Sequence, residues 1–188
     1  MTDLLHFDYQ LFHFINSGCQ NPLFDFLMPV LRNKYTWVPL YLFLLVFLLL
    51  NFKTKGLWLA LALIVTVGLT DSISSQLIKK NVMRLRPCKV MEQATDMNLL
   101  VPCGSGYSFP SSHAANHFGM AVLLCLTLGK IFRRVKWPLL FWAFAISFAQ
   151  VYVGVHFPLD VVCGALLGSL IAWGVKFVLY KFSAGTDL

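Results

Sequence analysis

The sequence predicts an all-α protein, an integral membrane helical bundle in which residues 1–188 form a single domain. Hydrophobic residues make up 58% of the chain, charged residues make up only 12%, and the mean hydropathy is +0.71. The apolar residues lie in long stretches, each close to the ~20 residues with which a helix crosses the ~30 Å core of a bilayer. Composition and the length of these stretches therefore both indicate a membrane protein.

Five apolar stretches are the expected transmembrane helices. The first is the shortest, and a start before residue 37 would lengthen it. Each of the others has enough residues to cross the hydrocarbon core as a helix. The five expected spans are residues 37–52, 57–78, 113–132, 137–155 and 159–180.

Residues 1–31 have a different character, because polar side chains are interspersed among Phe and Leu. These polar residues are Asp8, His13, Asn16, Asn21 and Asp25. Such a mixture is typical of an amphipathic helix at the membrane interface, or of a half-span. A sixth crossing in this segment is the alternative, so the sequence predicts five or six transmembrane helices.

The net charge of +7 is compatible with nucleic-acid binding, but the cations sort by membrane side instead. Cytoplasmic loops carry an excess of Lys and Arg. We therefore assign the more basic face to the cytoplasm, and we expect no nucleic-acid partner. The loop 80–107 then faces the periplasm or the outside of a bacterial inner (cytoplasmic) membrane. The cations of the predicted cytoplasmic face are Lys53, Lys55, Lys130, Arg133, Arg134, Lys136, Lys176 and Lys181.

Cys88 and Cys103 both lie in this outer loop. A disulfide between them would be stable in an oxidising compartment, and two free thiols are the alternative. No Cys-x-x-Cys pair occurs in the sequence, which argues against a structural zinc site.

Three short polar clusters interrupt the apolar stretches. Polar groups within a membrane segment cost free energy, so several of them together mark a functional site. By the count of spans, all three clusters lie at the outer ends of helices and can converge. They supply cations, a helix N-terminus with hydroxyl groups, and an imidazole near a carboxylate, all of which serve phosphoryl transfer. The clusters are Lys79 with Arg86-Pro87, Pro110-Ser111-Ser112-His113, and His156 with Asp160.

Each cluster alone has a simpler explanation. Lys79 and Arg86 suit cations at a membrane surface, Ser111 or Ser112 suits a helix cap, and Asp160 suits the first turn of a helix. The occurrence of all three in one chain favours a shared site.

Two further polar residues lie near these clusters. His117 follows His113 by one helical turn, a spacing that also occurs in metal sites. Ala114 stands where the zinc proteases have their glutamate, so we favour a packing role for His117 and expect no metal. Asp71 lies two turns before Lys79, and we expect it to support that lysine.

The spacing of the three clusters resembles that of the type 2 phosphatidic acid phosphatases. The family signature is Lys, six residues, Arg-Pro; then Pro-Ser-Gly-His; then Ser-Arg, five residues, His, three residues, Asp. The first motif matches in full, the second has Ser112 in place of Gly, and the third retains His156 and Asp160. Ala149 and Gln150 replace its Ser-Arg pair, so one phosphate-binding cation of the family is missing.

The resemblance implies a role for each residue. His156 is the nucleophile that forms a phosphohistidine, Asp160 orients it, and His113 protonates the leaving group and then activates water. Arg84 is a spare cation that could fill the gap left at Gln150, whose neutral amide could still donate a hydrogen bond to phosphate. The expected phosphate-binding residues are Lys79, Arg86, Ser111, Ser112, Gln150 and Arg84.

The resemblance also implies a metal-independent lipid phosphatase without a cofactor, whose partners are the bilayer, the lipid phosphate substrate and water. The expected reaction is conversion of undecaprenyl diphosphate to undecaprenyl phosphate. Phosphatidylglycerophosphate, phosphatidate and lipid A 1-phosphate are alternative substrates. A non-catalytic binder or transporter of anionic lipids is the alternative from another functional class, and the oligomeric state is left open.

Overall fold

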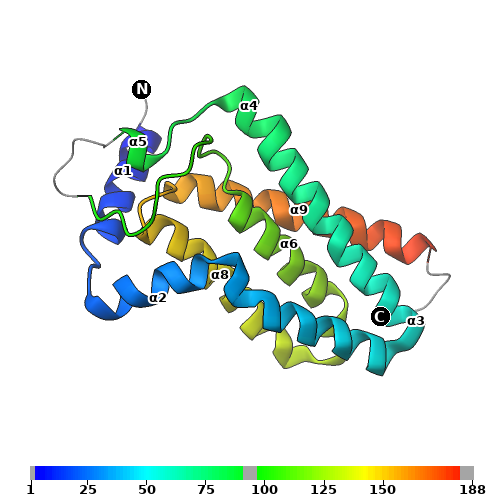
Figure 1. Cartoon of the computed structure of the whole chain (residues 1–188). Helices are drawn as coiled ribbons and strands as arrows, with labels where there is room; N and C mark the ends of the chain where they lie inside the picture. Colours follow the sequence, from blue (N-terminus) through cyan, green and yellow to red (C-terminus); the bar gives the residue numbers. More distant parts are fainter. Residues whose placement is uncertain (1–2, 91–96, 183–188) are drawn as a thin grey trace.

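The computed structural model describes residues 3–90 and 97–182, and every regular element within them is helical (Figure 1). The prediction of an all-helical protein is confirmed. Two segments, Lys34–Val90 and Pro158–Lys181, are long and apolar enough to cross a membrane. The number of crossings stays a prediction, because the first of these segments contains more than one helix.

The first segment folds back on itself within α3 (Val38–Ser72). Lys53 has a φ of 50°, in the left-handed region, and the chain reverses its direction there (Figure 1). A Cβ atom at Gly56 would collide with the carbonyl oxygen of Leu48, so the tight return requires glycine. The reversal separates α3 into two arms, which correspond to the predicted spans 37–52 and 57–78.

The second arm continues into a π-helical turn, η2 (Ile73–Ile78), and then into α4 (Lys79–Val82). Met83 ends α4 in the left-handed conformation, with a φ of 50°. π-Helical turns are frequent at functional sites, because they rotate the residues that follow relative to a regular helix. The first cluster therefore begins directly after an irregularity in its helix.

The central helix of the bundle is α6 (Ser112–Leu126), which packs against α3, α8 (Lys136–Tyr152) and α9 (Pro158–Phe182). Two glycines of α9 allow a close approach to α6. A Cβ on Gly164 would collide with the carbonyl oxygen of Ser111, and one on Gly168 with that of Ala115. Small residues allow membrane helices to pack closely in this way. The second cluster, at the start of α6, is thereby placed against the third, at the start of α9.

The predicted span 113–132 is interrupted after Leu126, where the short helix α7 (Leu128–Ile131) follows. A turn of 3₁₀ helix, η3 (Arg133–Val135), then leads into α8. A second such turn, η1 (Lys34–Trp37), precedes α3.

Large apolar side chains cover the outside of the bundle. Phe141, Leu170 and Trp173 are each about 70% exposed, whereas Thr66 and Thr70 are fully buried. Extensive exposed apolar surface is rare on a soluble monomer but favourable in lipid. The surface therefore agrees with the membrane location that the composition predicts.

The N-terminal segment forms α1 (Asp3–Asn16) and α2 (Pro22–Arg32), each shorter than a membrane crossing requires. Some of their polar side chains contact the rest of the protein, whereas His6 and Gln10 are exposed. Asn16 donates a hydrogen bond to the carbonyl oxygen of Tyr152 at 2.7 Å, and the Tyr152 hydroxyl donates to Asp25 at 2.6 Å. These contacts fasten both helices to the end of α8, next to the third cluster.

The outer loop contains the disulfide between Cys88 and Cys103, so the predicted bridge is confirmed. Cys88 lies in α5 (Pro87–Val90), and the two Cα atoms are 5.9 Å apart. Because Cys88 closely follows Arg86, the disulfide holds the first cluster against the part of the loop that leads into α6.

Candidate active site

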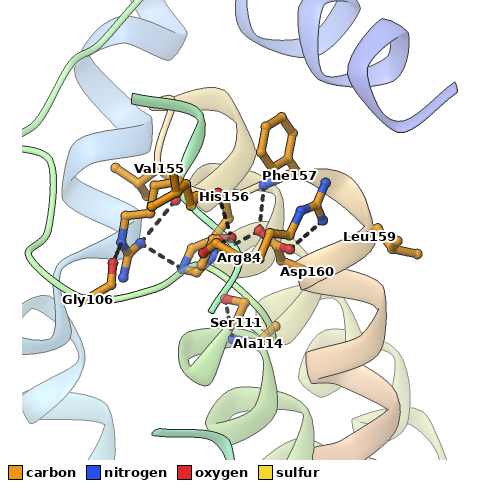
Figure 2. Close-up of polar contacts among 12 residues, drawn as sticks. Arg84, Gly106, Ser111, Ala114, Val155, His156, Phe157, Leu159 and Asp160 are labelled. Atoms are coloured by element: carbon orange, nitrogen blue, oxygen red, sulfur yellow. Dashed lines mark hydrogen bonds and ion pairs between the residues drawn. The ribbon is translucent and has the colours of Figure 1, made fainter. Parts of the chain in front are cut away.

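His156 lies in the turn between α8 and α9, at the centre of the polar cluster in Figure 2. The backbone N–H groups of Val155 and His156 both donate to the carbonyl oxygen of Gln150, each at 3.2 Å. Gly154 adopts a φ of 85°, which allows the chain to turn back at this point. The imidazole is 2% exposed, and its position is fixed by the fold of the turn.

Asp160 holds one side of this imidazole. Its Oδ2 atom lies 3.4 Å from His156 Nδ1 and accepts a hydrogen bond from the Phe157 N–H at 2.9 Å. A separation of 3.4 Å is long for a hydrogen bond, and catalytic contacts often shorten once substrate is bound. A carboxylate at Nδ1 favours the tautomer that leaves the Nε2 lone pair free.

Burial lowers the pKa of His156 to about 4, although the nearby carboxylate of Asp160 acts in the opposite direction. The imidazole is therefore neutral at physiological pH. A neutral imidazole with a free Nε2 atom can act as a nucleophile.

Arg86 faces that nitrogen. Its Nη1 atom lies 3.2 Å from His156 Nε2 and also donates to the carbonyl oxygen of Val155 at 3.0 Å, and its Nε atom donates to Gly106 at 3.0 Å (Figure 2). Two carbonyl groups thus orient the guanidinium beside the reactive atom. A phosphoryl group at Nε2 would meet a fixed cation that can donate two hydrogen bonds.

The second cluster forms the start of α6. Ser111 is fully buried, its hydroxyl caps the helix by accepting from the Ala114 N–H at 3.4 Å, and its own N–H donates to the Asp160 carbonyl oxygen at 2.9 Å. Ser112 Oγ lies 2.8 Å from Ser74 Oγ of η2. These contacts place the free N–H groups of α6, where anions bind favourably, near His156.

His113 and Lys79 border the same space. The charge of Lys79 acts on both His113 and His156, and the charge of His156 acts on His113. Neither side chain forms a hydrogen bond or ion pair with another residue of the described ranges. Both are therefore available to a ligand.

His117, in contrast, has partners at both ring nitrogens. Nδ1 lies 2.8 Å from the carbonyl oxygen of His113, and Nε2 lies 3.2 Å from the hydroxyl of Tyr41. The ring also packs edge-on against Trp142, with the ring centres 5.0 Å apart. These contacts agree with the packing role that the sequence favours.

Arg84 occupies a different position from the one predicted for a phosphate-binding cation. Its Nη1 atom donates to Asp160 Oδ1 and its Nη2 atom to Asp8 Oδ2, both at 2.6 Å. Its guanidinium also lies 4.2 Å from the centre of the Phe157 ring. Because two carboxylates occupy both terminal nitrogens, the contacts favour a role in positioning Asp160 over direct binding of phosphate.

Asp8 is a site residue that the sequence interpretation missed. It is 3% exposed, and its second oxygen accepts a hydrogen bond from the Leu159 N–H at 2.8 Å. α1 thus carries a carboxylate that bridges Arg84 and the first turn of α9. The only sequence signal was an acidic residue within an amphipathic segment, which equally fits a surface position.

Gln150 does not take the place of the missing arginine in any contact. The residue is fully buried, and neither polar atom of its amide has a hydrogen-bond partner in the described part of the chain. The structure therefore gives no support to the predicted hydrogen bond from Gln150 to phosphate, which stays a prediction.

An apolar cleft of about 660 Å³ runs from the second cluster between the arms of α3 and along α6. Ser112 and His113 line its polar end, and Leu48 and Leu124 line its far end. The dimensions and the lining fit a hydrocarbon chain attached to a polar group at the cluster.

Residues 55–183, which contain all three clusters, match the PAP2 superfamily. The chain belongs to the PAP2 superfamily. It is therefore a membrane lipid phosphatase, a hydrolase of phosphoric esters. The predicted family and enzyme class are confirmed.

Two curated relatives of this PAP2 phosphatase match nearly its full length. A lipid A 4'-phosphatase of Bacteroides thetaiotaomicron is 36% identical over 184 residues, covering 94% of this chain and 79% of that protein. An undecaprenyl-diphosphatase of Sulfolobus acidocaldarius is 35% identical over 172 residues, covering 89% and 76%.

Two crystal structures are also similar to this PAP2 phosphatase. LpxE of Aquifex aeolicus has a TM-score of 0.67 and 31% identity, and the match covers 90% of this chain and 94% of that one. A transmembrane PAP2-type phosphatidylglycerolphosphate phosphatase of Bacillus subtilis has a TM-score of 0.76, with coverage of 98% and 90%. Its identity of 23% supports the fold alone.

The position of Arg84 leads to a prediction about Gln150. We expect Arg84→Ala to lower kcat on the order of 10- to 100-fold and to destabilise the protein by about 3 kcal/mol, because Asp8 and Asp160 lose their shared counter-ion. The KM should change little, and adding Gln150→Arg should not restore kcat. Steady-state kinetics and thermal unfolding in detergent measure these effects. Recovery of activity in the double variant would instead indicate that Arg84 binds phosphate.

The burial of His156 predicts an unusual pH dependence. Its pKa of about 4 means that the nucleophile stays neutral above this pH and loses its free lone pair as the pH falls through it. We therefore expect that the decrease of kcat/KM at acid pH that is caused by protonation of the enzyme occurs well below pH 6.5, toward pH 4. The phosphate ester itself titrates near pH ~6, so its titration is measured separately by phosphorus NMR and subtracted. If protonation of the enzyme already lowered kcat/KM at pH 6.5 or above, the result would contradict this assignment.

Proposed function

We propose that this PAP2 phosphatase removes a phosphate group from a membrane lipid by double displacement at His156. The observation that carries this proposal is the arrangement of that imidazole, with Asp160 at Nδ1 and Arg86 at Nε2. Such an arrangement presents a neutral nucleophile and a cation to the same phosphoryl group.

In the first step, a bound phosphoryl group replaces the imidazole as the partner of Arg86. His156 Nε2 attacks phosphorus, a P–N bond forms, and the bond between phosphorus and the lipid oxygen breaks. His113, in its protonated form, gives a proton to the departing oxygen. Lys79, Arg86 and the N-terminus of α6 stabilise the charge on the three remaining phosphoryl oxygens.

In the second step, the lipid has left and water occupies its place. His113, now neutral, accepts a proton from this water as the water oxygen attacks phosphorus. The P–N bond breaks, inorganic phosphate leaves, and His156 returns to its neutral form. Asp160 balances the positive charge of the imidazole while it carries the phosphoryl group.

The lipid A 4'-phosphate is the first substrate to test, because the B. thetaiotaomicron relative with 94% coverage of this chain carries the name of that phosphatase. A second relative with that name, from Porphyromonas gingivalis, is 29% identical over 97% of the chain. This choice revises the preference for undecaprenyl diphosphate that the sequence suggested. Undecaprenyl diphosphate is the second candidate, supported by the 35% identical diphosphatase of S. acidocaldarius.

The apolar cleft supports a lipid substrate of either kind. Its polar end lies at Ser112 and His113, so a hydrocarbon chain in the cleft would hold the attached phosphate at the start of α6. The cleft accommodates a chain and does not select between an acyl and a polyprenyl tail.

A panel of purified lipid phosphates tests the proposal. The protein in detergent, with chelator present, is assayed side by side for phosphate release from lipid A, undecaprenyl diphosphate, phosphatidylglycerophosphate and phosphatidate. We expect phosphate release from lipid A with a kcat/KM at least tenfold above that for the other three lipids. Mass spectrometry of the product should show that the phosphate was lost from the 4' position. A higher kcat/KM for undecaprenyl diphosphate would assign the second candidate, and no release from any lipid would contradict the function.

We also propose that the site faces the periplasm, on the basis of the distribution of Lys and Arg between the two ends of the spans. Ser105, in the outer loop, is exposed and suits a cysteine label. A membrane-impermeant maleimide should modify Ser105→Cys in cells whose inner membrane is intact. Labelling only after that membrane is permeabilised would reverse the orientation.

A further inference from the structure

The third family motif contributes an arginine to the phosphate, and this chain has Gln150 at that position. We propose that Arg32, at the end of α2, is the additional phosphate-binding cation of this site. The inference rests on the proposed function, since it assigns a further residue to the same phosphate. It was not accessible from the sequence, because Arg32 lies outside all three clusters and more than forty positions before the first of them.

The end of α2 is held in a defined position. The indole N–H of Trp37 donates to the Leu31 carbonyl oxygen at 2.7 Å, and the Thr36 hydroxyl donates to that of Val30 at 2.8 Å. α2 also packs against α8, the helix that carries Gln150. Arg32 thus extends from a fixed backbone on an element that is adjacent to the helix with the missing cation.

The same end of α2 borders the substrate cleft. Lys34, two residues after Arg32, lines the cleft together with Ser112 and His113. The guanidinium of Arg32 is close enough to Arg86 and to His113 for its charge to act on both. The charge of Arg32 therefore acts on groups that border the space where the phosphate would bind.

Arg32 has no counter-ion among residues 3–90 and 97–182. Its side chain forms no ion pair with a described residue, and its Nε atom is buried without a hydrogen-bond partner. Burial, and then the charge of Arg86, lower the pKa of Arg32. Two partly buried arginines that repel each other are unfavourable unless an anion binds between them.

A simpler account is that Arg32 only interacts with the C-terminal dipole of α2, as basic residues in the last helical turn often do. That interaction is available to an arginine that extends into water. It does not explain a buried, unpaired Nε atom beside a second arginine. A bound phosphate explains both, because its oxygens accept hydrogen bonds from both guanidinium groups.

The test compares Arg32→Ala, Arg32→Gln and Arg32→Lys with the unchanged protein, and Lys80→Ala is the matched control. Lys80 is an exposed cation at the same end of the bundle and has no contact with the site in the described structure. We expect a 10- to 100-fold loss of kcat/KM in the alanine and glutamine variants, with partial recovery in the lysine variant. The control should stay within twofold of the unchanged protein.

Inhibition by inorganic phosphate or vanadate provides a readout that does not depend on the lipid tail. The inhibition constants should rise by at least fivefold in Arg32→Ala and Arg32→Gln and remain unchanged in Lys80→Ala. A second prediction is that Gln150→Arg restores activity to Arg32→Ala, because it returns a cation to the phosphate from α8. Thermal unfolding in detergent verifies that each variant is folded, and the conclusion is drawn from the folded ones.

The outcomes separate this inference from the proposed function. The role of Arg32 would be overturned if, in folded Arg32 variants, kcat/KM falls by less than fivefold and the inhibition constants rise by less than fivefold. The proposed lipid phosphatase function would then remain. Absence of phosphate release by the unchanged protein from every lipid would instead overturn the proposed function, and direct binding of inorganic phosphate or vanadate, measured by calorimetry on the same variants, would then still report on Arg32. Losses of fivefold or more in both assays, absent from Lys80→Ala, would establish the inference.

Discussion

The His156→Ala variant is expected to lose turnover on the order of 10⁴-fold or more, because no covalent intermediate can form without the Nε2 atom. The helical fold should be retained, since the side chain contacts Asp160 and Arg86 but lies in a turn between helices. Phosphate release by the purified variant, with circular dichroism for the fold, measures both effects.

Added imidazole is a useful control for this variant. The substitution leaves a buried space next to Asp160 and Arg86, into which free imidazole fits. We expect imidazole to restore a small part of the activity, and not to stimulate the unchanged protein. Retention of more than a few per cent of the activity by His156→Ala without imidazole would remove His156 from the role of nucleophile.

The His113→Ala variant is expected to form the phosphohistidine from a lipid monoester about 10²- to 10⁴-fold more slowly, because the departing lipid oxygen then receives no proton from the enzyme. The size of this loss should depend on the leaving group. The alkoxide that leaves a lipid phosphate monoester needs a proton. The lipid monophosphate that leaves a lipid diphosphate is already a stable anion. Pre-steady-state kinetics of phosphohistidine formation, with one lipid monoester and one lipid diphosphate, measure the difference.

His117→Gln is the matched control. The imidazole of His117 lies one turn further along α6, and its two nitrogens contact the His113 carbonyl oxygen and the Tyr41 hydroxyl. We expect a modest loss for this variant that does not depend on the leaving group. If His113→Ala slowed the formation of the phosphohistidine equally for both substrates, the result would contradict the role of His113 as general acid.

The sequence predicted the larger features of the fold because they follow from local patterns. The apolar stretches 37–52 and 57–78 became the two arms of α3, and the sharp reversal falls on the short polar segment between them. The third motif was also expected to lie between two spans, and His156 indeed lies between α8 and α9. Length, hydropathy and turn residues are sufficient for assignments of this kind.

Part of the geometry of the candidate site follows from the sequence for the same reason. His156 with Asp160, and Ser111 with the start of α6, are pairs whose members lie within a few residues of each other. Spacing along the chain therefore determines most of their geometry. Arg86, from another cluster, has its guanidinium 3.2 Å from the imidazole of His156.

The remaining site residues depend on contacts between distant parts of the chain. Arg84 and Arg86 are two positions apart, and nothing in their sequence shows that one reaches two carboxylates and the other the imidazole. Asp8 contacts Arg84 across 76 positions. Such long-range pairs are determined by how the helices pack, which one sequence alone does not reveal.

The N-terminal helices show the same limit. The pattern of polar residues in residues 1–31 is that of an interfacial helix, yet Asp8 and Asn16 are buried against the rest of the protein. An amphipathic pattern identifies one polar face but does not tell whether water or protein covers it.

Trapping of the covalent intermediate tests the central claim most directly. The His113→Ala variant is mixed with a lipid diphosphate labelled in the terminal phosphate, because this leaving group needs no acid while the water that cleaves the P–N bond lacks its base. The reaction is stopped with detergent at alkaline pH, where a phosphohistidine is stable, and the labelled peptide is identified by mass spectrometry. We predict label on the peptide that contains His156, at that residue, and its loss in acid. Label on any other residue, or turnover with no labelled protein during the burst, would contradict a double displacement at His156.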